Sequence, residues 1–90
     1  MRDKKSTAEM TADLFGLLLS LGTVDDMKAI FADLCTDKEI EQMAQRLRAA
    51  KLLKEGKTYA QVIEETEISS ATLSRVSRCV QYGEGYSRFL

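Results

Sequence analysis

Four helix-start signals, spread along the chain, constrain its fold most. Each is a Ser or Thr followed three residues later by an acidic or amide side chain: STAE from Ser6, TVDD from Thr23, TDKE from Thr36 and TYAQ from Thr58. The hydroxyl oxygen at such a position accepts a hydrogen bond from a free backbone N–H of the first helical turn. Because the sequence contains no proline and no sustained apolar alternation typical of half-buried strands, these signals predict an all-α fold.

Apolar residues at helical spacing and two glycines give the extent of each predicted helix. We expect a first helix to about residue 21, ended by Gly22, a second to about residue 34, a long third ended by Gly56, a short fourth after Thr58, and a fifth capped by Ser69. The expected apolar stripes of the first three helices are Met10, Leu14, Leu17, Leu18 and Leu21; Met27, Ile30, Phe31 and Leu34; and Ile40, Met43, Ala44, Leu47 and Ala50.

The first helix is apolar on nearly every side, because Phe15 and Leu19 lie outside its stripe. Such a helix must be covered all round, and a 90-residue chain buries only a modest fraction of its surface when it folds alone. We therefore expect a second copy of the chain as the cover, since most soluble oligomers are symmetric homo-oligomers. The alternative is a helix that docks on another protein or on a membrane, although it lacks the Lys- and Arg-rich polar face of a membrane-surface helix.

Composition excludes several classes of function. Apolar residues make up 44% and charged residues 30% of the chain, a balance typical of globular proteins. The chain has no histidine, and Cys35 and Cys79 form no CxxC pair, so neither a disulfide scaffold nor a metal site is expected. Without a nucleophile or nucleotide-loop constellation, we expect no catalytic residue, no cofactor and no enzymatic activity.

The apolar stretch LFGLLLSLG follows acidic residues and is too short to cross a bilayer, so we expect a cytoplasmic protein without a membrane partner.

Charge is unevenly distributed along the chain. Residues 1–41 contain five basic and nine acidic side chains, a net of −4, whereas residues 42–90 contain eight basic and five acidic side chains, a net of +3. The overall net charge of −1 therefore hides a basic half that can attract phosphates.

The segment TYAQVIEETEISSATLSRVSRCVQYG, residues 58–83, contains two short helical patterns with a three-residue interruption, which are the dimensions of a helix-turn-helix. In that motif the second helix enters the major groove of DNA, and the first helix crosses the backbone. The residues of the second helix expected to point outward are Ser70, Ala71, Ser74, Ser77 and Arg78, and those expected to point inward are Leu73, Val76 and Val80.

These outward residues suit contact with DNA. Small residues permit close approach, hydroxyls can meet bases or phosphates, and Arg can bond guanine or a phosphate in bidentate fashion. Backbone N–H groups of Tyr59 and Ala60 at a helix start can also bind phosphate. The expected DNA-binding residues are Tyr59, Ala60, Gln61, Ser69, Ser70, Ala71, Thr72, Ser74 and Arg78.

The alternative is a helical hairpin with a solvated Ser and Arg face. Glu67 favours this alternative, because the turn of a helix-turn-helix often uses Gly in a left-handed conformation, which costs a non-Gly residue about 1 kcal/mol. We therefore expect the turn to differ slightly from that of the motif.

The stretch DLCTDKEIEQMAQRLRAAKLLKEGKTYAQVIEETEISSATLSRVSRCVQYG resembles the Trp-repressor family, particularly its YerC/YecD-type Trp-repressor-related bacterial proteins. The resemblance covers about residues 33–86 and depends on a combination: the T-x-x-E start, QRL, the L-L-x-x-G exit, TY, and S-x-A-T-L-S-R-V. It implies an intertwined, all-helical homodimer that presents two helix-turn-helix heads to double-stranded DNA and acts as a transcriptional repressor. The alternative from another class is a small all-helical dimeric protein-interaction module without DNA binding.

The resemblance also implies where a small effector would sit. In Trp repressor, an arginine of the recognition helix holds the carboxylate of tryptophan, an arginine of the third helix flanks its ring, and a threonine lines the site; Arg75, Arg46 and Thr36 match these positions. Val76 stands where the repressor has Gly, and Cys79 replaces a serine. Because an inward β-branched side chain should fill the slot, we expect that L-tryptophan does not bind and that any effector is another molecule. The alternative role of the two arginines is ion pairing with Glu39, Glu41 or Glu64.

We expect one domain with four segments. These are a tail over residues 1–5, a helical dimerisation core over 6–56, a helix-turn-helix over 57–83 and a C-terminal segment over 84–90. Tyr86, Phe89 and Leu90 of the last segment are expected to form a final helical turn over the core or over the partner.

Overall fold

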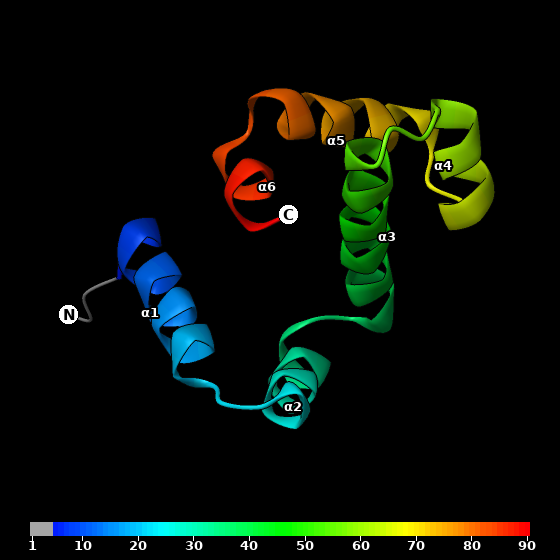
Figure 1. Cartoon of the computed structure of the whole chain (residues 1–90). Helices are drawn as coiled ribbons and strands as arrows, with labels where there is room; N and C mark the ends of the chain where they lie inside the picture. The colour runs from blue at the N-terminus through cyan, green and yellow to red at the C-terminus, as the bar shows by residue number, and fades with distance from the viewer. Residues whose placement is uncertain (1–4) are drawn as a thin grey trace. The chain divides into compact units, whose positions relative to one another are not determined.

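Helices make up the regular secondary structure of residues 5–90, the part of the chain that the computed structural model describes (Figure 1). Their bounds are α1 Thr7–Ser20, α2 Val24–Leu34, α3 Asp37–Lys54, α4 Tyr59–Thr66, α5 Ser70–Tyr82 and α6 Glu84–Phe89. The predicted all-α class is confirmed, and each predicted helix end lies within a residue or two of the observed one. Of the predicted tail over residues 1–5, residues 1–4 lie outside the described part.

Three of the four predicted capping signals, those at Ser6, Thr23 and Thr58, are confirmed, and the signal at Thr36 stays a prediction. The hydroxyl oxygens of Ser6 and Thr23 each accept a hydrogen bond from the backbone N–H three residues on, at 3.1 and 3.0 Å. Thr58 and Gln61 form a complete capping box, in which the Thr58 N–H donates to Gln61 Oε1 at 2.9 Å and the Gln61 N–H donates to Thr58 Oγ1 at 3.2 Å. Ser69 caps α5 with a single bond of the kind that Ser6 and Thr23 accept, from the Thr72 N–H at 3.2 Å. Each cap satisfies a donor that the helix itself leaves unpaired.

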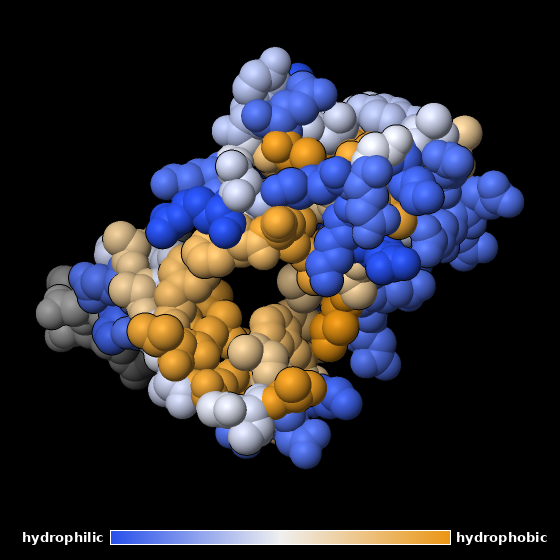
Figure 2. Space-filling view, viewed as in Figure 1, coloured by the Kyte–Doolittle hydropathy of each residue, from blue (hydrophilic) through white to orange (hydrophobic). Residues whose placement is uncertain are grey.

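The chain divides into two compact units, Met1–Thr36 and Asp37–Leu90. In the first unit, neither α1 nor α2 contains a buried residue, and Figure 2 shows apolar side chains gathered over the surface of both helices. The large exposed apolar side chains of these two helices are Met10, Leu14, Phe15, Leu17, Leu19, Val24, Met27 and Leu34. The apolar stripes predicted for α1 and α2 are therefore present but not buried within the chain.

The second unit contains the buried core. Figure 1 shows α4 and α5 at the C-terminal end of α3, with α6 folded back beside α5. The core consists of Ala49, Ala50, Leu52, Val62, Ile68, Leu73 and Val76, and the side chains packed against it are Leu53, Ile63, Val80, Tyr86 and Leu90. Every helix of this unit thus contributes an apolar face to one cluster, and this cluster fixes the direction of α5.

The stripe predicted for α3 is only partly correct. Of its five members, Ala50 alone is buried, Ile40 and Met43 are half-buried, and Ala44 and Leu47 are exposed. The face that meets α4 and α5 is instead centred on Ala49 and Leu52. Helical periodicity finds an apolar face, but α3 has two such faces, and only tertiary packing decides which one α4 and α5 cover. The predicted division between a dimerisation core, 6–56, and a helix-turn-helix, 57–83, stays a prediction.

Candidate nucleic-acid interface

The connection between α4 and α5 is a three-residue turn with a left-handed first residue. Glu67 has φ 60° and ψ 18°, Ile68 is buried, and Ser69 is the N-cap of α5. The Thr66 hydroxyl donates to the Val62 carbonyl at 2.7 Å and accepts from the Ile68 N–H at 3.3 Å. The expectation that a non-Gly residue would alter the turn is wrong, because Glu67 takes the left-handed conformation itself. On the α4 side its N–H donates to the Ile63 carbonyl at 2.8 Å, and on the α5 side the buried Ile68 and the Ser69 cap follow it.

Two contacts from α3 hold the end of α4. Gln45 Nε2 donates to the Thr66 carbonyl at 3.1 Å, which satisfies a carbonyl that the end of the helix leaves unpaired. Arg48 Nη2 lies 2.9 Å from Glu65 Oε1, and both side chains are about half exposed. The hydrogen bond that Arg48 donates to Glu65, and then the negative charge of Glu65, raise the pKa of Arg48 above its usual value. Such an exposed pair contributes little to stability, but it limits how α4 can turn on α3.

Helix α5 presents one buried and one exposed face. Leu73, Val76 and Ser77 are buried, whereas the exposed side chains are Ser70, Ala71, Ser74, Arg75, Arg78, Gln81 and Tyr82. The prediction that Ser77 points outward is wrong, because its side chain is only 8% exposed. Ser77 follows Leu73 by four residues and therefore lies on the same side of the helix.

Three of the predicted contact residues use polar atoms to cap helices. Gln61 accepts from the Thr58 N–H, and the Ser69 hydroxyl oxygen accepts from the Thr72 N–H at 3.2 Å. The Ser69 hydroxyl also donates to Thr72 Oγ1 at 2.9 Å. The structure thus places Gln61, Ser69 and Thr72 at the helix starts, where they hold the backbone in position.

The remaining predicted contact residues lie on the outer surface. The side chains of Ser70, Ser74 and Arg78 are exposed, and within residues 5–90 they form no hydrogen bond. Ala71 lies beside them and leaves the backbone accessible. This face offers hydroxyls and one guanidinium on a short, rigid helix whose inner side is packed.

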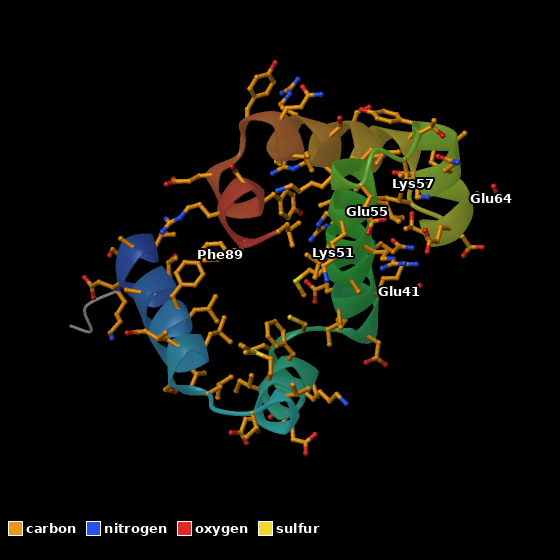
Figure 3. The ribbon with its side chains drawn as sticks, viewed as in Figure 1. Glu41, Lys51, Glu55, Lys57, Glu64 and Phe89 are labelled. Atoms are coloured by element: carbon orange, nitrogen blue, oxygen red, sulfur yellow. The ribbon has the colours of Figure 1, made fainter. Side chains whose placement is uncertain are left out.

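The start of α4 adds backbone donors. Tyr59 is 45% exposed, and the N–H groups of Tyr59 and Ala60 lie in the first turn, where no intrahelical acceptor exists. Lys57, labelled in Figure 3, directly precedes the capping Thr58. Glu64 lies on the outer side of the same helix. The N-terminal end of α4 therefore suits a phosphate, whereas its acidic C-terminal end does not.

A cavity of about 340 Å³ separates parts of α3, α5 and α6. It is lined by Arg46, Arg75, Val76, Cys79, Gly83, Gly85 and Tyr86. The two arginines and Val76 of the predicted effector site thus surround one space, and Val76, only 2% exposed, forms part of its floor. The third predicted residue, Thr36, belongs to the other unit. Gly83, Gly85 and Tyr86 were not predicted as cavity residues, because only the fold brings α6 to this place.

The alternative role of Arg46 and Arg75, in ion pairs, is not observed. Within residues 37–90, Arg48 pairs with Glu65 and Arg88 pairs with Glu84. Neither Arg46 nor Arg75 belongs to one of them.

Two further kinds of site are absent from the described residues. No three His, Cys, Asp or Glu side chains gather there as metal ligands would. No helix in residues 5–90 combines the length and the apolar composition needed to cross a membrane.

Comparison with known proteins shows what the chain is similar to. The family model described as Trp repressor protein matches residues 9–90. The uncharacterized protein YerC of Bacillus subtilis (strain 168) is 49% identical over 70 residues, which are 78% of this chain and 67% of YerC. A crystal structure of a proposed Trp repressor from Staphylococcus aureus has a TM-score of 0.87 and 40% identity, covering 91% of this chain and 83% of that one. A crystal structure of a TrpR-like protein from Eubacterium eligens ATCC 27750 has a TM-score of 0.85 and 42% identity, covering 89% of this chain and 84% of that one. The predicted Trp-repressor-like fold is confirmed.

Proposed function

We propose, because this chain belongs to the Trp repressor protein family, that it is a sequence-specific DNA-binding transcriptional repressor. In this proposal it acts as a homodimer in the bacterial cytoplasm and reads double-stranded DNA through α4, the turn and α5. The observation that carries the proposal is the outer face of α5, where Ser70, Ala71, Ser74 and Arg78 are exposed on a helix that is packed on its other side.

The geometry of the two helices supports a division of labour at the DNA. In a helix-turn-helix, the first residues of the second helix contact base edges in the major groove. Ser70, Ala71 and Ser74 occupy that part of α5 and are small enough for close approach. Arg78 lies one turn further on, where its guanidinium can bond guanine or a phosphate in bidentate fashion. The N–H groups of Tyr59 and Ala60, together with Lys57, would hold a phosphate of the backbone.

The uncovered apolar surface supports the homodimer. Phe15 is 62% and Leu19 is 87% exposed, and Leu47 of α3 is exposed as well. A monomer that exposes so many large apolar side chains would be prone to association, and a symmetric copy is the commonest cover. Trp repressor is one of the dimers that define helix-turn-helix binding to two half-sites of DNA, whose centres lie about 34–36 Å apart. We propose the same spacing for this protein.

We propose that L-tryptophan is not an effector of this protein, so that its helix-turn-helix is either permanently set or governed by another molecule. Val76 lies among the cavity-lining residues and is nearly fully buried. A β-branched side chain at this place is stiff and cannot move aside without strain. Calorimetry of the protein with L-tryptophan tests this directly: no heat of binding is expected, and micromolar binding would refute the argument from Val76.

The experiment that tests the function is selection of bound genomic fragments with purified protein, followed by titration of a selected duplex at several salt concentrations. A DNA-binding protein that neutralises several phosphates loses affinity steeply as salt rises, because counterions are released on binding. We expect sequence-enriched fragments and a steep salt dependence. If no fragment is enriched even at low ionic strength, the protein-interaction alternative takes the place of DNA binding.

A further inference from the structure

The junction between α5 and α6 is unusually tight. The Gly83 N–H donates to the Cys79 carbonyl at 2.7 Å. A Cβ at Gly83 would lie 2.5 Å from the same carbonyl oxygen and 3.2 Å from the Cys79 carbonyl carbon and Cα. Because these neighbours are backbone atoms, no side-chain rotation can relieve the contact. Only glycine allows the chain to leave α5 and begin α6 in this way. At Gly85, two residues later, an added Cβ would meet nothing within 4 Å.

Helix α6 then connects α5 to α3. Lys54 Nζ donates to the Tyr86 carbonyl oxygen at 3.4 Å, and the side chains of Tyr86 and Leu90 pack against the core cluster. Tyr86 also lines the cavity, together with Arg46 from α3 and Val76 from α5. By contrast, Phe89 is 78% exposed. Tyr86 and Leu90 thus pack on the core, whereas a contact between Phe89 and the partner stays a prediction.

The geometry points to Tyr86 as a positioning residue for α5. Without α6, the C-terminal half of α5 would lie beside a cavity open to solvent. The aromatic ring of Tyr86 closes one wall of that space, and the Gly83 junction keeps α6 close enough for it to do so. The direction of the outer face of α5 then depends on α6, although no residue of α6 lies on that face. The consequence for DNA binding rests on the function proposed above, whereas the consequence for α5 itself does not.

Hydrogen exchange tests the positioning of α5 without DNA. In Tyr86→Ala, we expect the amides of α5 to exchange about tenfold faster than in the wild type, because helices that lose packing open locally. The amides of α3 serve as the internal reference, since loss of the whole fold would accelerate both helices equally. Tyr86→Phe is the conservative control: the ring remains, and the hydroxyl forms no hydrogen bond within residues 5–90, so α5 should keep its protection.

The two glycines give a matched second pair that leaves the Tyr86 ring in place. Gly83→Ala should accelerate the exchange of α5 amides as Tyr86→Ala does, whereas Gly85→Ala should not. Equal behaviour of the two glycine variants, or unchanged α5 exchange in both Tyr86→Ala and Gly83→Ala, would overturn the positioning role.

The affinity for a selected duplex, and its recovery when a small aromatic molecule is added, distinguish a positioning role of Tyr86 from a merely structural one. If only about a tenth of the Tyr86→Ala heads hold α5 in the binding orientation, the apparent Kd rises about tenfold. Added p-cresol, which supplies the missing ring to the cavity, should then restore most of the affinity in Tyr86→Ala but not in Gly83→Ala. Rescue of both variants, or of neither, would contradict the assignment of Tyr86. If the wild type binds no DNA at all, the proposed function fails, and the exchange data alone still decide whether Tyr86 positions α5.

Discussion

Replacing Glu67 by Gly should stabilise the protein, although it removes a side chain and changes no packing. Glu67 has a left-handed backbone, φ 60° and ψ 18°, which costs a non-Gly residue about 1–2 kcal/mol. Gly removes that cost but loses about 0.5–1 kcal/mol because it is more flexible in the unfolded chain. The difference is a net gain of about 0.7 kcal/mol. For a domain of this size, such a gain raises Tm by about 3–6 °C.

The matched control is the same chemical change three residues earlier. Glu64 lies within α4, where Gly is a poor helix former, so Glu64→Gly should cost about 0.5–1 kcal/mol. Both variants lose one exposed carboxylate near the end of α4, so their charge effects largely cancel in the comparison. Thermal unfolding followed by circular dichroism at one protomer concentration gives both Tm values. If Glu67→Gly lowers Tm as Glu64→Gly does, the left-handed strain at Glu67 is not real and the reasoning on the turn fails.

Three other changes have definite expected outcomes. Arg78→Ala should cost about 1–3 kcal/mol of affinity for a selected duplex, whereas Lys57→Ala should weaken all duplexes alike and reduce the salt slope by about 1; fluorescence anisotropy at several salt concentrations distinguishes the two, and identical behaviour would contradict the roles assigned. Ser6→Ala removes the cap of α1 and should cost about 1 kcal/mol, measured by urea unfolding; an unchanged midpoint would mean that the cap contributes nothing. Val76→Ala should destabilise the fold by about 2 kcal/mol through an enlarged cavity, and calorimetry of this variant with L-tryptophan should show binding if Val76 is what excludes the ligand.

The helix ends could be predicted from the sequence because their causes are local. Ser6, Thr23 and Thr58 each bond a donor three residues away, and no distant part of the chain is needed for that bond. The same holds for the three-residue turn, whose length follows from the spacing of Thr66 and Ser69. The left-handed backbone of Glu67 was not predicted, because the local preference against it is outweighed by the burial of Ile68 and by the Ser69 cap, which follow it.

Features that depend on distant contacts could not be predicted. The apolar residues of α3 could form two faces. Because α4 and α5 pack on one of them, Ala49 and Leu52 are buried and Leu47 is exposed. The outward prediction for Ser77 is a different case, because its four-residue spacing from Leu73 already indicates the buried side of the helix. The cavity wall formed by Tyr86 requires the reversal at Gly83, which a sequence pattern does not reveal. Some of the residues predicted to contact DNA have exposed side chains without hydrogen bonds, and others form the caps at the helix starts. Their contacts with DNA stay a prediction.

The most direct test of the central claim is the salt dependence of binding between the protein and a two-half-site duplex, with the mass of the complex measured in the same samples. The account predicts two protomers per duplex and an affinity that falls by orders of magnitude between low and physiological salt. One protomer per duplex, or an affinity that does not change with salt, would contradict it.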